Sequence, residues 1–123
     1  GIVPFGDKGD IAVVGDWNRD GYDTLGLSRP EGVAKRFFLT NSNIQPVAEG
    51  DFLFGNATDT PIAGDWDNDG FSTIGLKRGN TWFLSNSNIR VIANQTFMFG
   101  DPGDKALTGE WSRNRGTNVG VAR

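Results

Sequence analysis

The chain contains no cysteine and no histidine among its 123 residues. The missing cysteines exclude disulfides and thiol nucleophiles. The missing histidines exclude Ser–His catalysis, haem bound through histidine and ordinary zinc sites. Catalysis would have to use carboxylates, lysines or the single tyrosine, Tyr22. These absences favour a protein that is not an enzyme.

Positive charge is also scarce. Twelve Lys and Arg stand against fifteen Asp and Glu, giving a net charge of −3, which disfavours nucleic acid as a partner. The longest aliphatic run, residues 11–14, is far shorter than the roughly 20 residues of a membrane helix, so we expect no membrane insertion. Residues 1–6 lack the pattern of a signal peptide. Either such a peptide was removed or the chain is a piece of a longer one.

Glycine and tryptophan are abundant, with 18 and 4 copies, and an internal repeat accounts for them. Each copy opens with Phe-Gly, continues to Gly-Asp-Trp or Gly-Glu-Trp and has another glycine nine residues after the tryptophan. Trp17, Trp66 and Trp111 mark three copies, spaced 49 and 45 residues apart. The longer first copy contains Pro30–Lys35, which we expect to form a loop at a hairpin tip.

The second copy has the pattern of four short strands, and no segment has a helical period. The expected strands are residues 60–64, 73–78, 81–85 and 95–99. Gly79-Asn80 is typical of a two-residue hairpin turn. The third strand is apolar at consecutive positions, so both of its faces are expected to be covered.

A four-stranded repeat of 45 to 49 residues is typical of one β-propeller blade. We therefore predict an all-β fold of four-stranded antiparallel blades, with about two and a half blades in this chain. Residues 1–6 would end a preceding blade, 7–55 and 56–100 form two blades, and 101–123 begin a third. The alternative is a β-sandwich, which does not require a Trp-bearing loop at this period. Closed propellers need about four to eight blades, so we expect self-association, adjacent blades of a longer chain or an open stack.

An acidic loop follows the first strand of each of the first two copies. Residues 16–24 and 65–73 both fit the pattern D-x-[DN]-x-D-G. Side chains at positions 1, 3 and 5 can converge on a hard cation, glycine at position 6 permits a sharp turn, and the carbonyl at position 7 adds an oxygen. Position 12 is leucine in both copies, so neither loop is an EF-hand.

The Phe-Gly opening, the Gly-Asp-Trp strand end and the acidic loop together resemble the FG-GAP or VCBS-type repeats. These occur in bacterial secreted proteins, fungal propeller lectins and the integrin α-chain head. The resemblance implies bound Ca²⁺ and a secreted, extracellular or cell-surface location. It nominates as ligands Asp16, Asn18, Asp20 and the Tyr22 carbonyl, and Asp65, Asp67, Asp69 and the Phe71 carbonyl.

Two departures limit this expectation. Position 9 is Thr24 or Thr73, where the family often has aspartate. In the third copy Glu110 keeps one carboxylate but Arg115 replaces the turn glycine, so we expect no metal there. Arg113 or Arg115 would instead place a positive charge at that position. For the first two loops, the alternative to metal binding is that Asp and Asn simply cap turns.

The three loop tryptophans either wedge between blades or stack on sugars, and their recurrence favours the wedge. Arg29 and Arg78 end equivalent strands and are expected to be solvated. The two Asn-Ser-Asn segments either form turns or offer hydrogen bonds to a glycan. The candidate glycan contacts are Asn41, Asn43, Asn86 and Asn88.

Two classes of function follow from these patterns. The first is an extracellular structural or adhesive scaffold whose repeats assemble with other copies or further blades. The second is a carbohydrate-binding propeller lectin. An incomplete set of repeats presents unpaired strands, which favours the scaffold. The extra residues of the first copy favour the lectin, because they make one blade different from the others.

Overall fold

The protein is described by a computed structural model that covers residues 10–42, 50–109 and 116–122. Every regular element in these ranges is a β-strand, which confirms the predicted all-β class. The strands are β1 (Ile11–Gly15), β2 (Thr24–Glu31), β3 (Ala34–Leu39), β4 (Gly50–Asn56), β5 (Thr60–Gly64), β6 (Thr73–Arg78), β7 (Thr81–Leu84), β8 (Gln95–Met98), β9 (Lys105–Gly109) and β10 (Asn118–Ala122).

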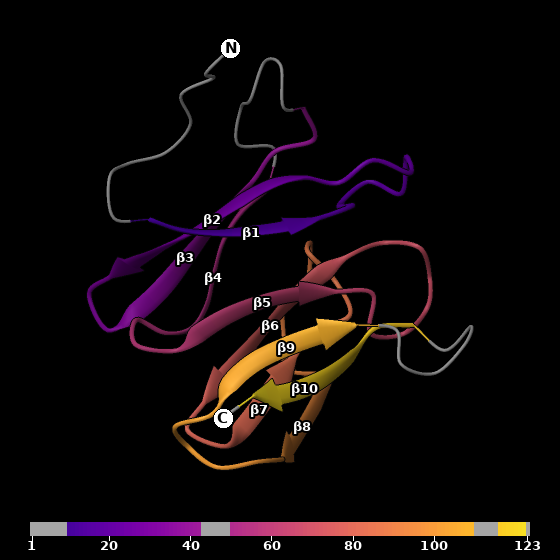
Figure 1. Ribbon diagram of the computed structural model, residues 1–123. Helices are drawn as coiled ribbons and strands as arrows, with labels where there is room; N and C mark the ends of the chain where they lie inside the picture. Colours follow the sequence, from indigo (N-terminus) through magenta and orange to yellow (C-terminus); the bar gives the residue numbers. More distant parts are fainter. Residues whose placement is uncertain (1–9, 43–49, 110–115, 123) are drawn as a thin grey trace.

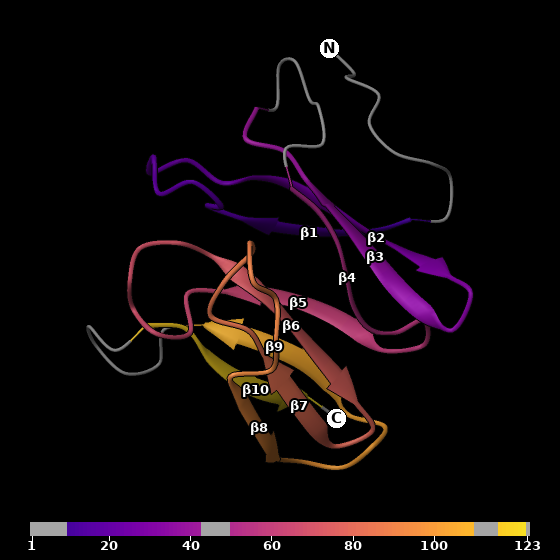
Figure 2. The same cartoon turned by 180° about the vertical axis from the view of Figure 1, so that it is seen from behind.

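The strands form three antiparallel sheets that follow the sequence repeat. β1-β2-β3-β4 and β5-β6-β7-β8 are four-stranded sheets in chain order, and β9 pairs with β10. The first sheet lies above the other two in Figure 1, and the reverse view shows the same layering (Figure 2). β1 lies against β5, and β5 lies against β9. The first strands of successive repeats are therefore neighbours in space.

The hairpin turns agree with the sequence in the second repeat and differ in the first. Gly79-Asn80 connects β6 to β7 as predicted. The prediction that residues 30–35 form a loop is wrong, because Pro30 pairs with Lys35 and only Gly32-Val33 forms the turn. The extra residues therefore lengthen the β2–β3 hairpin. Lys35 is also only 1% exposed, which is unlike a residue in a loop at a hairpin tip.

The first and second sheets pack through one apolar core. Its buried members are Val13, Trp17, Phe37, Leu39, Ile74 and Leu76. Trp17 lies between the sheets, as the wedge interpretation predicts, and its indole N–H donates to the Leu25 carbonyl at 3.1 Å. Each fully buried large side chain contributes roughly 1.5–3 kcal/mol. Sheet-on-sheet packing is thus a main source of stability.

A second core joins the second and third sheets. Its buried members are Ile62, Trp66, Trp82 and Leu84, with Phe97, Ala106, Val119 and Val121 packed against them. Phe83, between Trp82 and Leu84 in β7, packs instead on the first core. Both faces of β7 are therefore covered, which confirms the prediction. Trp66 lies between the second and third sheets, as Trp17 lies between the first and second. Trp111 lies outside the described residues.

Gly75 has no room for a side chain. A Cβ at this position would lie 2.6 Å from Leu84 Cδ2 and 3.0 Å from Ile62 Cγ1, both in the second core. We expect Gly75→Ala to lower the free energy of unfolding by about 1–3 kcal/mol, measured by urea denaturation. Gly103→Ala is the control, because no atom lies within 4 Å of its added Cβ. Equal losses at the two positions would contradict this packing.

Candidate functional site

The acidic loop of the second repeat closes on its own first residue. Asp65 accepts backbone N–H groups from Asp69 at 3.0 Å and from Gly70 at 2.9 Å. Asp69 accepts from the N–H of Phe71 at 2.9 Å. Gly70 has φ +94°, which explains why glycine occupies the sixth position. One carboxylate oxygen from each of Asp65, Asp67 and Asp69 lies within 4.8 Å of the other two.

The acidic loop of the first repeat has the same arrangement. Asp16 accepts N–H groups from Asp20 at 3.1 Å and from Gly21 at 2.9 Å. Asp20 accepts from the N–H of Tyr22 at 2.9 Å, and Asn18 Oδ1 accepts a longer bond from the N–H of Asp20 at 3.3 Å. The structure therefore gathers the nominated side chains of each loop around one turn.

The donor set of the second loop suits a hard divalent cation. Ca²⁺ takes oxygen ligands at 2.3–2.6 Å, so two oxygens on one ion lie at most about 5 Å apart. The 4.8 Å spread of the three carboxylates satisfies this limit. A carboxylate oxygen that accepts one N–H keeps a second lone pair, so turn capping and ion binding are compatible. Desolvation within the loop and the nearby charge of Asp69 raise the pKa of Asp67.

The ninth loop position has a structural role in both repeats. Thr24 donates its hydroxyl to the Thr40 carbonyl at 2.6 Å, and Thr73 donates to the Gly64 carbonyl at 3.4 Å. Both threonines are buried, at 6% and 3% exposure. Their hydroxyls face the strands, so any cation would depend on positions 1, 3, 5 and 7.

Each loop is hydrogen-bonded to the loop of the next repeat. The Asp16 carbonyl accepts from the N–H of Ser72 at 2.8 Å, and the Asp16 N–H donates to Ser72 Oγ at 3.0 Å. Asp65 and Thr117 repeat this exchange at 2.7 and 2.9 Å. The first residue of each acidic loop therefore also ties two sheets together.

The fourth loop position also faces the next repeat. Arg19 and Asn68 both adopt left-handed backbone conformations there, with φ 61° and 58°. The Arg19 side chain lies over Gly70, where its Nε would be only 2.6 Å from an added Cβ. A positive charge thus borders the acidic loop of the second repeat.

An aspartate–arginine pair recurs in both repeats and was not predicted from the sequence. Arg29 donates to Asp10 through Nε and Nη2 at 3.0 and 2.9 Å. Arg78 donates to Asp59 in the same way at 2.8 and 2.9 Å. The aspartate side chains are 5% and 0% exposed. The expectation that both arginines are simply solvated is wrong, because each reaches back to the segment that precedes its repeat's first strand.

The sequence contains a signal for these pairs. An aspartate recurs four residues after each Phe-Gly, at Asp10, Asp59 and Asp104. Each paired arginine also lies over a phenylalanine of the third strand, at 4.7 Å for Phe38 and 4.6 Å for Phe83. Such stacking covers the guanidinium while leaving its donors free for the carboxylate. The repeated Phe-Gly-x-x-x-Asp spacing therefore has a structural cause.

The Asn-Ser-Asn segment of the second repeat lines a cavity of 240 Å³ beside the acidic loop. Trp17, Asp69 and Phe71 form other parts of its wall. The Oδ1 atoms of Asn86 and Asn88 are buried and have no hydrogen-bond partner within the described ranges. Two acceptors without donors make this cavity a candidate polar binding site.

The other two nominated asparagines are placed differently. Asn41 lines a neighbouring cavity of 190 Å³ together with Trp17 and Asn88. Asn43 lies outside the described residues. The structure therefore brings Asn41, Asn86 and Asn88 to one region between the first two sheets.

The third loop, residues 110–115, also lies outside the described residues, so its lack of metal and the role of Arg113 or Arg115 stay predictions. In the part of the chain that is described, no helix has the length and hydropathy to cross a membrane. No protein-family model matches the chain, and the searches of curated proteins and of solved structures also give no match.

Proposed function

We propose that the chain is a non-catalytic, calcium-stabilised repeat module of the β-propeller type that serves as an extracellular structural or adhesive scaffold. The observation that carries this proposal is the pair of acidic loops, which share one hydrogen-bond pattern and stand at successive sheet junctions. A cation in each loop would offset the repulsion between its carboxylates. It would thereby stabilise Asp16 and Asp65, the residues that link neighbouring sheets.

The arrangement of the sheets supports a propeller-type stack. The first strands of successive repeats are neighbours, and a separate apolar core fills each junction. The resemblance to FG-GAP or VCBS-type repeats, which rests on the same loops, agrees with this arrangement. The partners we propose are further repeats, from a longer chain or from other molecules.

Calcium is expected to raise the melting temperature of the chain. A weak extracellular site at about ten times its Kd adds about 1.4 kcal/mol, or about 5 °C for a domain of this size. We expect two such increments between chelator and about 1 mM Ca²⁺, and one in Asp67→Ala, which removes a ligand side chain from the second loop. Glu31→Gln is the control, because it removes an equal charge from an exposed ion pair at the opposite end of β2 from the first acidic loop. An unchanged melting temperature in wild-type protein would refute the proposal.

A glycan-binding role is the second candidate, and the cavity beside Asn86 and Asn88 favours it. Two buried amide oxygens without donors suit a ligand rich in hydroxyl groups, and the wall includes the aromatic residues Trp17 and Phe71. A glycan array with wild-type protein and Asn88→Ala tests this role. Binding that Asn88→Ala abolishes would support the lectin, and absence of binding would favour the scaffold.

A further inference from the structure

β10 has one unpaired edge in the part of the chain that the structure describes, whereas the equivalent strands of the other two sheets are paired on both sides. β2 and β6 occupy the same place in their repeats, and each pairs with a strand on both sides. Within the described ranges β10 pairs with β9 alone. Its second edge therefore presents backbone N–H and C=O groups that a further strand can bind.

The two complete sheets show which residues a third strand places on this edge. Leu39 pairs opposite Gly26, and Leu84 pairs opposite Gly75. In each case a leucine methyl fills the space that a Cβ on the glycine would need, at 2.7 and 2.6 Å. Gly120 is the equivalent residue of β10. Like Gly26 and Gly75, it pairs with the middle residue of the first strand of its repeat. A leucine is thus the expected partner of Gly120.

The residue before that leucine is phenylalanine in both repeats. Phe38 pairs opposite Leu27, and Phe83 pairs opposite Leu76. Phe83 packs on the core shared with the preceding sheet. The equivalent position on the third sheet is opposite Val121, and a phenylalanine there would face the second sheet.

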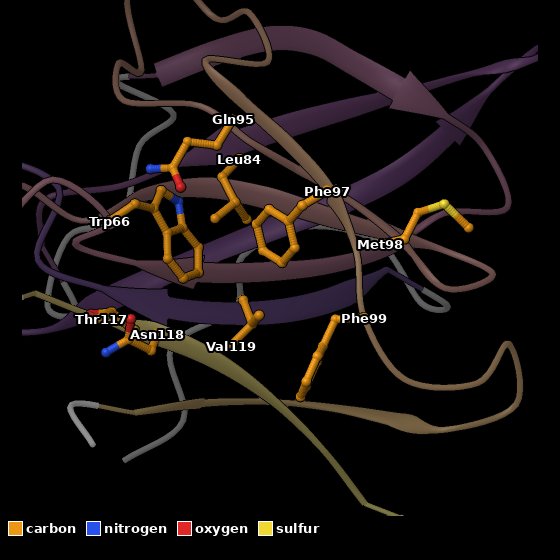
Figure 3. A pocket seen from close by; sticks show the side chains of 9 residues that line it. All are labelled: Trp66, Leu84, Gln95, Phe97, Met98, Phe99, Thr117, Asn118 and Val119. Atoms are coloured by element: carbon orange, nitrogen blue, oxygen red, sulfur yellow. The ribbon is translucent and has the colours of Figure 1, made fainter. Parts of the chain in front are cut away.

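A cavity of 310 Å³ lies at this place between β8 and β10. Figure 3 shows Trp66 and Phe97 on one side of the opening, and Val119 and Phe99 on the other. The cavity can hold a phenyl ring, and six of the nine residues that line it are apolar. The indole N–H of Trp66 is buried in this wall and has no acceptor within the described ranges, whereas that of Trp17 is bonded.

Exposure also distinguishes this junction from the first. Ile74 and Leu76 of β6 are 0% and 1% exposed, whereas the equivalent Val119 and Val121 of β10 are only half-buried. The neighbouring Met98 and Phe99 are 70% and 48% exposed. The junction is therefore built like the first one but lacks the cover that β7 gives there.

We propose that β10 is a docking edge for a further antiparallel strand that carries the motif aromatic–Phe–Leu. This motif is Phe37-Phe38-Leu39 in β3 and Trp82-Phe83-Leu84 in β7. The leucine pairs with Gly120, and the phenylalanine fills the cavity between β8 and β10. This inference rests on the proposed scaffold role and names the chemistry of the segment that joins the scaffold.

The test adds a synthetic peptide with the sequence of residues 79–88, which contains the motif and no methionine, to the wild-type chain. Met98 is the only methionine, so its methyl NMR signal reports directly on this junction. We expect a saturable shift of that signal. A peptide with Phe83→Ser should bind about tenfold or more weakly, because it lacks the buried ring.

Three results would overturn the inference. The wild-type peptide could leave the Met98 signal unchanged, or the Phe83→Ser peptide could bind as tightly. Alternatively, the signal could shift with the concentration of the chain alone, which would assign the edge to a second copy. The rise in melting temperature with Ca²⁺ is measured without peptide and tests the scaffold proposal. The peptide titration tests this inference, so the two can fail separately.

Discussion

Asp59→Asn is expected to lower the free energy of unfolding by about 3 kcal/mol, measured by urea denaturation at neutral pH. The Asp59 carboxylate is fully buried and accepts two bonds from Arg78 and one from the N–H of Asn56 at 2.8 Å. Its charge also acts on Lys35, which is 1% exposed. The neutral side chain keeps the shape but leaves these groups without their counter-charge.

The matched control is Asp51→Asn. Asp51 also pairs with an arginine, Arg36, at 2.6 Å, but its side chain is 48% exposed. Exposed pairs contribute about 0–1 kcal/mol, so we expect a small loss. Similar losses in Asp51→Asn and Asp59→Asn would contradict a special role for the buried pair.

The same contacts make the effect of Asp59 depend on pH. Burial alone would raise the pKa of Asp59, but its hydrogen bonds from Arg78 and Asn56 and the charges of Arg78 and Lys35 lower it overall. A lowered pKa stabilises the fold fully above the unfolded value of about 3.9, and this stabilisation is lost as the pH falls through the folded value. The difference between wild type and Asp59→Asn should therefore shrink below about pH 4.

Trp82→Ala is expected to cost about 4 kcal/mol, measured by thermal or urea unfolding. Trp82 is 0% exposed, stacks on Phe97 with ring centroids 6.3 Å apart and donates its N–H to the Phe99 carbonyl at 3.0 Å. Lys77 Nζ lies 5.9 Å from the ring centroid. Truncation therefore removes packing, a hydrogen bond and a cation contact together.

Trp82→Phe separates these contributions. Phenylalanine keeps most of the packing on Phe97 but leaves the Phe99 carbonyl without its donor, which costs about 1–3 kcal/mol. We expect its loss to be clearly smaller than that of Trp82→Ala. A loss below about 1 kcal/mol for Trp82→Ala would show that the second core does not hold the second and third sheets together.

The sequence predicted the strands of the second repeat well because their signals are local. Gly79-Asn80 marks one turn, and the apolar run around Phe83 marks a strand covered on both faces. The recurrence of Trp17 and Trp66 at one loop position correctly predicted that they wedge between sheets. These inferences needed only spacing and residue type.

The features that were missed depend on contacts between distant residues. Arg78 meets Asp59 across 19 residues, and only the fold brings the arginine back to the segment before β5. The extra residues of the first repeat pair with each other, which residue type alone did not show, because Pro30 and Gly32 are typical of loops. Likewise, the exchange between Asp16 and Ser72 requires two sheets to be stacked.

The central claim is that the two acidic loops bind calcium at the sheet junctions. The most direct test is isothermal titration calorimetry of Ca²⁺ into the chelator-treated wild-type chain, with Asp16→Asn and Asp65→Asn as loop variants. We predict two sites per chain, one of which is lost in each variant. No binding by the wild-type chain, or a stoichiometry that both variants leave unchanged, would contradict the claim.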